Sequence, residues 1–128
     1  MEKDLKHSDI TGKVIGCAMK VHRHFGLGFP ERVYQNCLII ELEKEGLKCT
    51  AETCRDIYYE GKLVGARRLD ILVEDKVLVE LKAVSEIDKT FSNQVINYLR
   101  VFDLEVGLLL NFGQESLFFK RYIYSKSK

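Results

Sequence analysis

Three charged residues interrupt the most apolar stretches in the middle of the chain. Asp70 directly precedes Ile71-Leu72-Val73, and Glu80 and Lys82 stand among the aliphatic residues of segment 77–84. A charged side chain inside a buried strand is costly unless it is paired or bound to a metal ion. Because side chains alternate between the two faces of a strand, Glu80 and Lys82 share one face. These three residues are therefore the first candidates for a chemical site.

The length of the turn between the two segments decides whether Asp70 lies on the same face. A two-residue loop (74–75) would place Asp70 opposite Val79, whereas a three-residue loop (74–76) places it directly opposite Glu80. Only the three-residue loop leaves one wholly apolar face, made of Ile71, Val73, Val77, Val79 and Leu81. The apolar pattern therefore predicts that Asp70 and Glu80 oppose each other.

Two opposed carboxylates repel each other at a Cβ separation of about 5 Å, so the pair calls for a cation. Lys82 could neutralise part of that charge, and the site would then be a structural ion pair near a strand edge. A divalent ion with oxygen ligands, the usual arrangement for Mg²⁺, is the alternative that we favour.

At these residues the chain resembles the PD-(D/E)XK nuclease superfamily. Asp70 followed by Glu80-Leu81-Lys82 is similar to its D…(D/E)-x-K signature, with Leu69 where the superfamily name has proline. The closer resemblance is to the GxxExxY family, a small PD-(D/E)XK-like family, and it extends from Ile10 to Tyr122. Four motifs carry it: Val21-His22-Arg23, Gly28-Phe29-Pro30-Glu31-Arg32-Val33-Tyr34, Val79-Glu80-Leu81-Lys82-Ala83-Val84 and Gly107-Leu108-Leu109-Leu110-Asn111-Phe112-Gly113.

The resemblance implies a Mg²⁺-dependent phosphodiesterase that acts on nucleic acid, with DNA favoured and Mn²⁺ as a substitute ion. Asp70, Glu80 and the backbone carbonyl of Leu81 would bind the metal, and Glu31 on an early helix would complete the acidic cluster. Lys82 would orient the attacking water and stabilise charge on the phosphate.

Gln94 and Tyr98 match the Q-x-x-x-Y pattern found after the lysine in exonuclease-type members. By that resemblance Gln94 would hold the lysine or a substrate phosphate, and Tyr98 would contact the nucleic-acid backbone. Four residues apart, they share one face of the expected helix, where a tyrosine can equally belong to the core.

Other charged residues also have two interpretations. Glu31 lies in the first turn of a helix, where the macrodipole favours a carboxylate whatever its role. Arg67, Arg68 and Lys62 could meet phosphates or form a solvated strand edge. A catalytically silent nucleic-acid-binding or protein-interaction module that keeps the nuclease fold is the alternative to an enzyme. A homodimer is a further alternative, because small chains often double their site by two-fold symmetry.

Periodicity predicts an α/β architecture, an α+β sandwich with a restriction-endonuclease-like core in which helices flank a mixed β-sheet. We expect one domain over residues 1–128, with frayed termini at 1–8 and 125–128. Ser85 and Asp88 suggest a capping box for the third helix. The expected helices are 9–25, about 30–46 and 86–102, and the expected strands are 49–59, 62–73, 77–84, 106–112 and 117–124.

Composition restricts the class of protein further. With 128 residues and a net charge of +1, the chain has no overall charge with which to attract nucleic acid, so a local site must supply the attraction. Its longest apolar run, residues 106–110, is too short to cross a bilayer, and no membrane association is expected. The four cysteines lack C-x-x-C spacing and the start does not resemble a signal peptide, which together predict reduced thiols in the cytoplasm.

Overall fold

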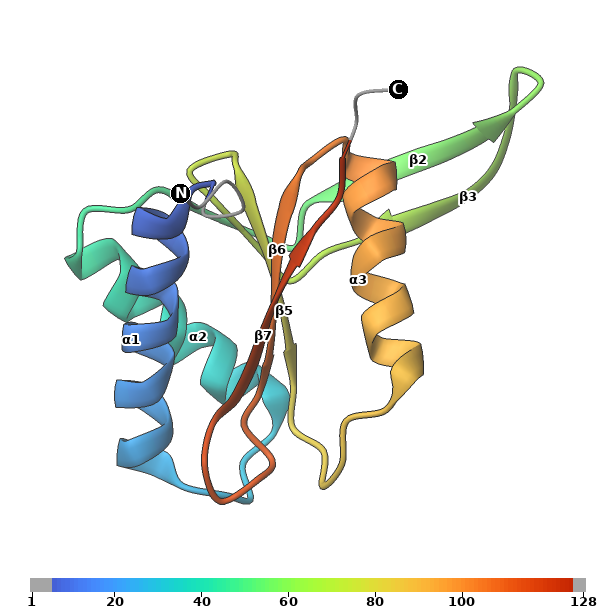
Figure 1. Cartoon of the computed structure of the whole chain (residues 1–128). Helices are drawn as coiled ribbons and strands as arrows, with labels where there is room; N and C mark the ends of the chain where they lie inside the picture. Colours follow the sequence, from blue (N-terminus) through green and yellow to red (C-terminus); the bar gives the residue numbers. More distant parts are fainter. Residues whose placement is uncertain (1–5, 126–128) are drawn as a thin grey trace.

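A five-stranded β-sheet runs through the middle of the protein, with helices on both of its faces (Figure 1). The computed structural model describes residues 6–125. The sheet has the strand order β1-β4-β5-β6-β7, and β2 and β3 form a separate two-stranded sheet. In chain order the elements are α1 (Ser8–Phe25), α2 (Glu31–Lys44), β1 (Cys49–Ala51), β2 (Cys54–Tyr59), β3 (Lys62–Arg68), β4 (Ile71–Val73), β5 (Val77–Lys82), α3 (Lys89–Phe102), β6 (Val106–Asn111) and β7 (Phe118–Ile123).

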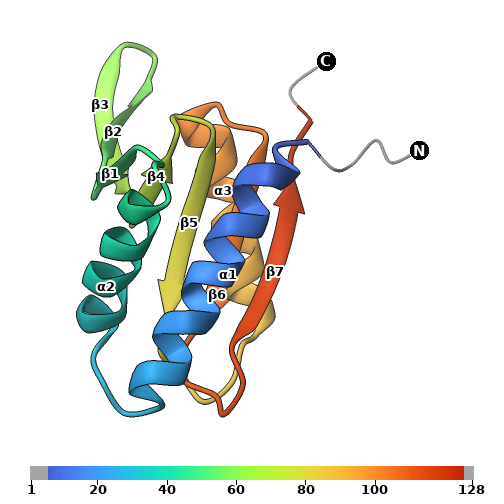
Figure 2. The ribbon, with the colours of Figure 1, turned by 90° about the vertical axis from the view of Figure 1, so that its left-hand side faces the viewer.

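The three helices divide between the two faces of the sheet. Helices α1 and α2 lie together over one face, in front of the sheet in Figure 2, and α3 lies on the other face. Strands β5 and β6 are parallel, and α3 is the crossover that a parallel pair requires. The other neighbours in the sheet are antiparallel, so the sheet is mixed, as the sequence predicts.

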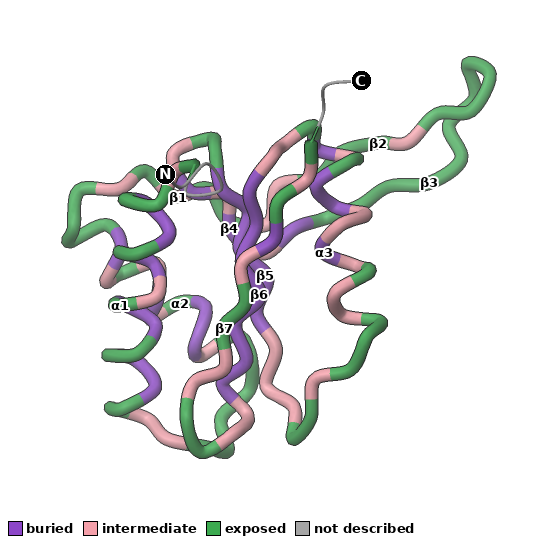
Figure 3. Tube along the Cα trace, viewed as in Figure 1, coloured by how far each residue is buried: buried purple, intermediate pink, exposed green. Residues whose placement is uncertain are grey.

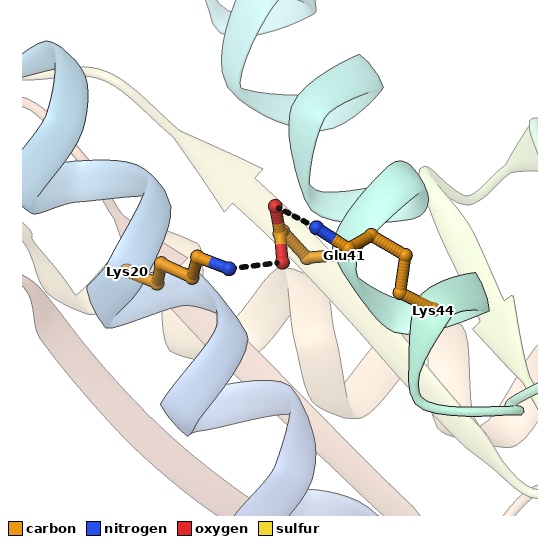
Figure 4. Close-up of polar contacts among 3 residues, drawn as sticks. All are labelled: Lys20, Glu41 and Lys44. Atoms are coloured by element: carbon orange, nitrogen blue, oxygen red, sulfur yellow. Dashed lines mark hydrogen bonds and ion pairs between the residues drawn. The ribbon is translucent and has the colours of Figure 1, made fainter.

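Helices α1 and α2 also meet through a small group of charges on the outer surface. Glu41 of α2 accepts a hydrogen bond from Lys20 of α1 at 2.9 Å and lies 3.5 Å from Lys44 of its own helix (Figure 4). Exposed ion pairs of this kind contribute little to stability, because water screens them. The apolar residues beneath them therefore hold the two helices on the sheet.

Each face of the sheet carries its own hydrophobic core (Figure 3). On the α1/α2 side the sheet contributes the five alternating residues predicted as one apolar face, and all of them are buried. On the α3 side, Leu78 and Leu109 pack against residues of the helix such as Leu99. Gly107 lets α3 approach closely, because a Cβ there would lie 3.1 Å from Val95 Cγ1.

Two of the expected strands are wrong as continuous elements. The predicted strand 49–59 is divided into β1 and β2, and 62–73 is divided into β3 and β4. At the break Glu52 adopts a left-handed backbone (φ 54°), and its N–H donates to the Asp70 carbonyl at 2.9 Å. The chain thus bends out of the sheet there, and β2 and β3 continue as a hairpin that projects beyond α3 (Figure 1).

The predicted start of the third helix is also wrong. The helix begins at Lys89 rather than Glu86, and Ser85 does not take part in a capping box. Asp88 is the N-cap, with its side chain accepting a hydrogen bond from the Thr90 N–H at 2.8 Å. Aspartate is among the best N-cap residues, so the helix begins directly after it.

Within residues 6–125, no helix has the length and apolar character that a membrane span needs. The expectation of frayed termini falls mostly on residues 1–5 and 126–128, which lie outside the described residues.

Candidate active site

Asp70 and Glu80 lie side by side across the β4–β5 hairpin. Val73 pairs with Val77 and Ile71 with Val79, so the three-residue turn and its register are confirmed. The Asp70 N–H donates to Glu80 Oε2 at 3.1 Å, and the Leu81 N–H donates to Asp70 Oδ2 at 2.8 Å. Each carboxyl group is therefore held by a backbone amide of the opposite strand.

Without a bound metal ion, the environment of Glu80 favours the protonated, neutral form of its carboxyl group. Only 4% of the residue is exposed, and this burial, followed by the charge of Asp70, raises the pKa of Glu80 to about 9. Protonated Glu80 can share its proton with the Asp70 carboxylate. A divalent cation bound to both groups would replace that proton, and hard carboxylate oxygens are ligands that suit such a cation.

Lys82 lies at the end of β5, on the same face as Glu80. Its Nζ sits 4.7 Å from the centre of the Phe91 ring, at the start of α3. Its positive charge acts against the rise in pKa at both Glu80 and Glu31. Lys82 forms no ion pair with a carboxylate within residues 6–125, so its ammonium group is held by an aromatic face and remains able to bind an anion.

Helix α2 brings Glu31 to the same end of β5. Burial first, and then the negative charge of Asp70, raise the pKa of the Glu31 carboxyl, while Lys82 and a hydrogen bond from the Ala83 backbone act in the opposite direction. One turn further along α2, the buried Gln35 donates from Nε2 to the Asp70 carbonyl at 3.3 Å. Sequence reasoning missed Gln35, although a polar residue four positions after Glu31 on the same helix face was a usable signal.

The residues flanking Glu31 explain the spacing of the Gly28 to Tyr34 motif. Gly28 has a φ of 102°, a backbone conformation that glycine adopts at no steric cost. The fully buried Tyr34 donates its hydroxyl to the Gly26 carbonyl at 2.5 Å and accepts a hydrogen bond from the Phe29 N–H. Its ring stacks on Phe112 with 4.6 Å between centroids. Tyr34 thus fixes the loop that positions the N-terminus of α2.

Asn111 at the end of β6 holds the segment that follows Lys82. Its buried amide accepts from the Val84 N–H and the Gly113 N–H, and donates to the Val84 carbonyl and Gln114 Oε1, all within 3.1 Å. Sequence reasoning did not assign Asn111 or Gly113 a role in the site, because Val84, the backbone that Asn111 holds, lies 27 positions earlier in the chain.

Gln94 and Tyr98 lie on α3 beside the carboxyl pair. Gln94 donates from Nε2 to the Tyr98 hydroxyl at 3.2 Å, and its buried Oε1 has no hydrogen-bond partner among residues 6–125. Burial, followed by the charge of Glu80, raises the pKa of Tyr98. Tyr98 is 8% exposed and packs in the α3 core, so its hydroxyl reaches the site from within the protein.

The structure thus brings Glu31, Asp70, Glu80 and Lys82 to one end of β5. Within the described range 6–125, however, no group of three or more His, Cys, Asp or Glu residues is arranged to hold a metal ion. The hydrogen bonds above give the physical reason: Asp70 and Glu80 are turned toward backbone amides, and Glu31 toward that of Ala83.

Glu80→Gln should stabilise the protein without metal, and increasingly so as the pH rises. In the unfolded chain the Glu80 carboxyl loses its proton near pH 4.5, whereas in the folded protein its pKa is about 9. The free energy of unfolding of the wild type therefore declines as the pH rises from 4.5 to about 9, and that of the glutamine variant does not share this decline. Thermal unfolding in chelator from pH 5 to 9 should show the variant gaining several degrees over the wild type near pH 8. Glu86→Gln, in the exposed loop before α3, is the matched control. Parallel curves for Glu80→Gln and the wild type would contradict the prediction.

Comparison with known proteins agrees with this geometry. The sequence matches a family model of the PD-(D/E)XK nuclease superfamily over residues 8–122. A comparison with curated proteins gives no match.

Two solved structures share the fold. The crystal structure of SSO0001 superposes with a TM-score of 0.58 at 19% identity, covering 76% of this chain and 52% of that one, so the chain spans about half of SSO0001. An alkaline exonuclease (LHK-Exo) from Laribacter hongkongensis superposes with a TM-score of 0.53 at 12% identity, covering 98% of this chain and 73% of that one. The restriction-endonuclease-like fold predicted from the sequence is confirmed.

Proposed function

Because the chain belongs to the PD-(D/E)XK nuclease superfamily, we propose that it hydrolyses phosphodiester bonds in nucleic acid, with DNA as its preferred substrate. The observation that carries the proposal is the pairing of Asp70 with the buried Glu80, with Lys82 on the same strand face and without a carboxylate partner in the described chain. A structural ion pair would have placed the lysine on the carboxylates.

In this proposal Asp70, Glu80, the Leu81 carbonyl and Glu31 would hold Mg²⁺, or Mn²⁺ in its place. The bound ion would polarise the phosphate and lower the pKa of the attacking water. Support comes from the chemistry of the donor set, since two adjacent carboxyl groups in a buried setting gain most from a divalent ion. The carboxylate oxygens of Asp70 and Glu80 now accept hydrogen bonds from backbone amides. Rotation of these side chains would free the oxygens to bind the ion.

The remaining residues would bind and orient the substrate. Lys82 would leave the Phe91 ring to contact the scissile phosphate and hold the attacking water. The amide oxygen of Gln94 has no hydrogen-bond partner in the described part of the chain, which supports a role in holding the Lys82 ammonium. Tyr98, its neighbour on α3, would contact the backbone of the nucleic acid through its hydroxyl.

Two finer assignments belong to the same proposal. Membership of the GxxExxY family is supported by the distinct positions of Gly28, Glu31 and Tyr34 in the loop, the site and the core. A cytoplasmic location is supported by four cysteines that form no disulfide in the structure.

A catalytically silent module that binds nucleic acid or protein is the second candidate. It is favoured by one observation, the lack of a three-ligand metal group within the described part of the chain. The two candidates differ in whether a bond is cut.

A nuclease assay decides between them. We expect single-stranded, double-stranded or branched DNA, or RNA, to be cut with Mg²⁺ or Mn²⁺, and chelator to stop the reaction reversibly. Lys82→Ala should slow cleavage by about a hundredfold, which is the rate enhancement that one side chain acting in proton transfer typically supplies. Lys89→Ala, an exposed lysine at the start of α3, is the control. No cleavage of any substrate by the wild type would leave only the silent module.

A further inference from the structure

The β2–β3 hairpin is the part of the structure that packing explains least. Every residue from 54 to 68 except Ile57 is exposed, and the hairpin extends past α3 into solvent (Figures 1 and 3). Its tip carries large apolar side chains that are 60–68% exposed: Tyr58, Tyr59, Leu63 and Val64. Arg55 at the base of the hairpin lies over the Phe102 ring of α3, and beyond its base the hairpin covers no core in the described part of the chain. A two-stranded hairpin of this kind is marginally stable by itself, which favours a role in contacting another molecule.

One face of the hairpin carries positive charge and no acid. Strand pairing places Arg55 opposite Arg67 and Tyr59 opposite Lys62, with the bulge confined to the β3 side near Val64. Alternation then defines what we call the cationic face, which consists of Arg55, Ile57, Tyr59, Lys62, Gly65 and Arg67. The other face carries Asp56, and its Arg68 forms an ion pair with Glu52.

The base of the cationic face is fixed to α3 beside the candidate active site. Arg67 Nε donates to Asn97 Oδ1 at 3.0 Å, and Arg55 Nη1 donates to the Val101 carbonyl at 3.3 Å. The Arg67 charge lowers the pKa of Tyr98 while that of Glu80 raises it, so Arg67 and the carboxyl pair lie around the same hydroxyl. The cationic face therefore begins beside the candidate active site at Arg67 and extends away from it toward Lys62 at the tip.

The charges on this face suit a polyanion better than a second copy of the chain. Like charges directly opposite in a hairpin are destabilising, yet Arg55 faces Arg67. Within residues 6–125, no carboxylate forms an ion pair with Arg55, Lys62 or Arg67. Four cations and two acids give residues 54–68 a net charge of +2, against +1 for the whole chain. Two cationic faces brought together would repel each other.

We propose that the cationic face of the β2–β3 hairpin is an arm that binds the backbone of nucleic acid next to the site, an inference that rests on the proposed function. Arg67 and Arg55 contact phosphates near the site, Lys62 contacts one near the tip, and Tyr59 stacks on a base or sugar. Strands of six and seven residues reach about 20 Å. That length spans about six base pairs of duplex, so the arm explains how a nearly neutral protein holds such a substrate.

Binding of labelled nucleic acid tests the arm separately from cleavage. The probes are a labelled 15-base-pair DNA duplex, the corresponding DNA strand and an RNA of the same sequence, titrated with the intact protein in chelator and followed by fluorescence anisotropy. Lys62→Ala should weaken duplex binding about five- to tenfold near 0.1 M salt and reduce the slope of log K against log salt by about 0.9. Tyr59→Ala should weaken single-strand binding about fivefold or more.

Lys13→Ala, which removes an exposed lysine from α1, is the matched control, and Lys62→Arg should retain binding. Equal affinities for Lys62→Ala and Lys13→Ala would overturn the arm, as would failure of the wild type to bind any probe. A wild-type dimer that Tyr59→Ala converts to a monomer, with binding of nucleic acid unchanged, would identify the hairpin as a contact between copies and also overturn it. Weaker binding by Lys62→Ala in a protein that cuts no substrate supports the arm and refutes the proposed nuclease activity.

Discussion

Asp70→Asn is expected to abolish metal-dependent cleavage, with a loss of about a thousandfold or more. Asparagine keeps an oxygen that can accept the Leu81 N–H, so the β4–β5 hairpin should fold as before. Asparagine lacks the negative charge with which Asp70 would bind a divalent ion. The cleavage rate falls about tenfold for each 1.4 kcal/mol of transition-state stabilisation that is lost, so a loss of several kcal/mol gives the expected effect. The measurements are the initial cleavage rate and calorimetric titration with Mg²⁺, which should show binding to the wild type only.

The matched control for this change is Asp75→Asn. Asp75 lies in the turn at the far end of the same hairpin, where it forms an exposed ion pair with Lys48. Its backbone has a φ of 55°, which asparagine tolerates. Full cleavage by Asp70→Asn, or equal losses in the two variants, would show that the carboxyl pair is not the catalytic centre.

Gly113→Ala is expected to destabilise the protein by about 3 kcal/mol and to lower its melting temperature by about 10 °C. A Cβ at this position would lie 2.3 Å from the Val84 nitrogen and 2.6 Å from the Ala83 carbonyl carbon. Because these are backbone atoms of a segment held by Asn111, they cannot move aside as a flexible side chain can.

The same substitution should impair catalysis in the protein that remains folded. Ala83 directly follows Lys82 and supplies the backbone hydrogen bond to Glu31, so displacing it moves two site residues together. Thermal unfolding and cleavage well below the melting temperature measure the two effects. In Gly16→Ala the new Cβ would meet no atom within 4 Å among residues 6–125 apart from its chain neighbours and the backbone of its own helix, and this exposed position in α1 should gain about 0.5–1 kcal/mol of stability. If the two variants melted alike, Gly113 would have no packing role.

The opposition of Asp70 and Glu80 follows from the sequence alone. Both residues belong to one hairpin with a three-residue turn, and a shift of one position would have turned its apolar side chains to the wrong face. The extents of α1 and β6 followed similarly from local periodicity. The start of α3 did not, because Ser85 and Asp88 are both good caps and only the folded chain selects one.

Partners distant in the chain required the tertiary structure. Gln35 reaches the Asp70 carbonyl across 35 positions, and Asn111 binds Val84 across 27. Local sequence patterns predict which side of a helix or strand is buried, but they do not predict which other element covers that side.

The sequence by itself therefore determined the carboxyl pair, the lysine on the same strand face and the layered architecture, because all three depend on alternation within contiguous segments. The resemblance predicted Glu31 beside them, and the tertiary structure shows that α2 carries it to that end of β5. Only the tertiary structure decided that Asn111 and Gly113 lie against the segment after β5, and that β2 and β3 leave the sheet. The physical reason for the last is that residues alternate in the same way along a strand whether it pairs within a core sheet or projects into solvent. The bend at Glu52 and the contacts of Arg55 and Arg67 with α3 set the direction of the hairpin.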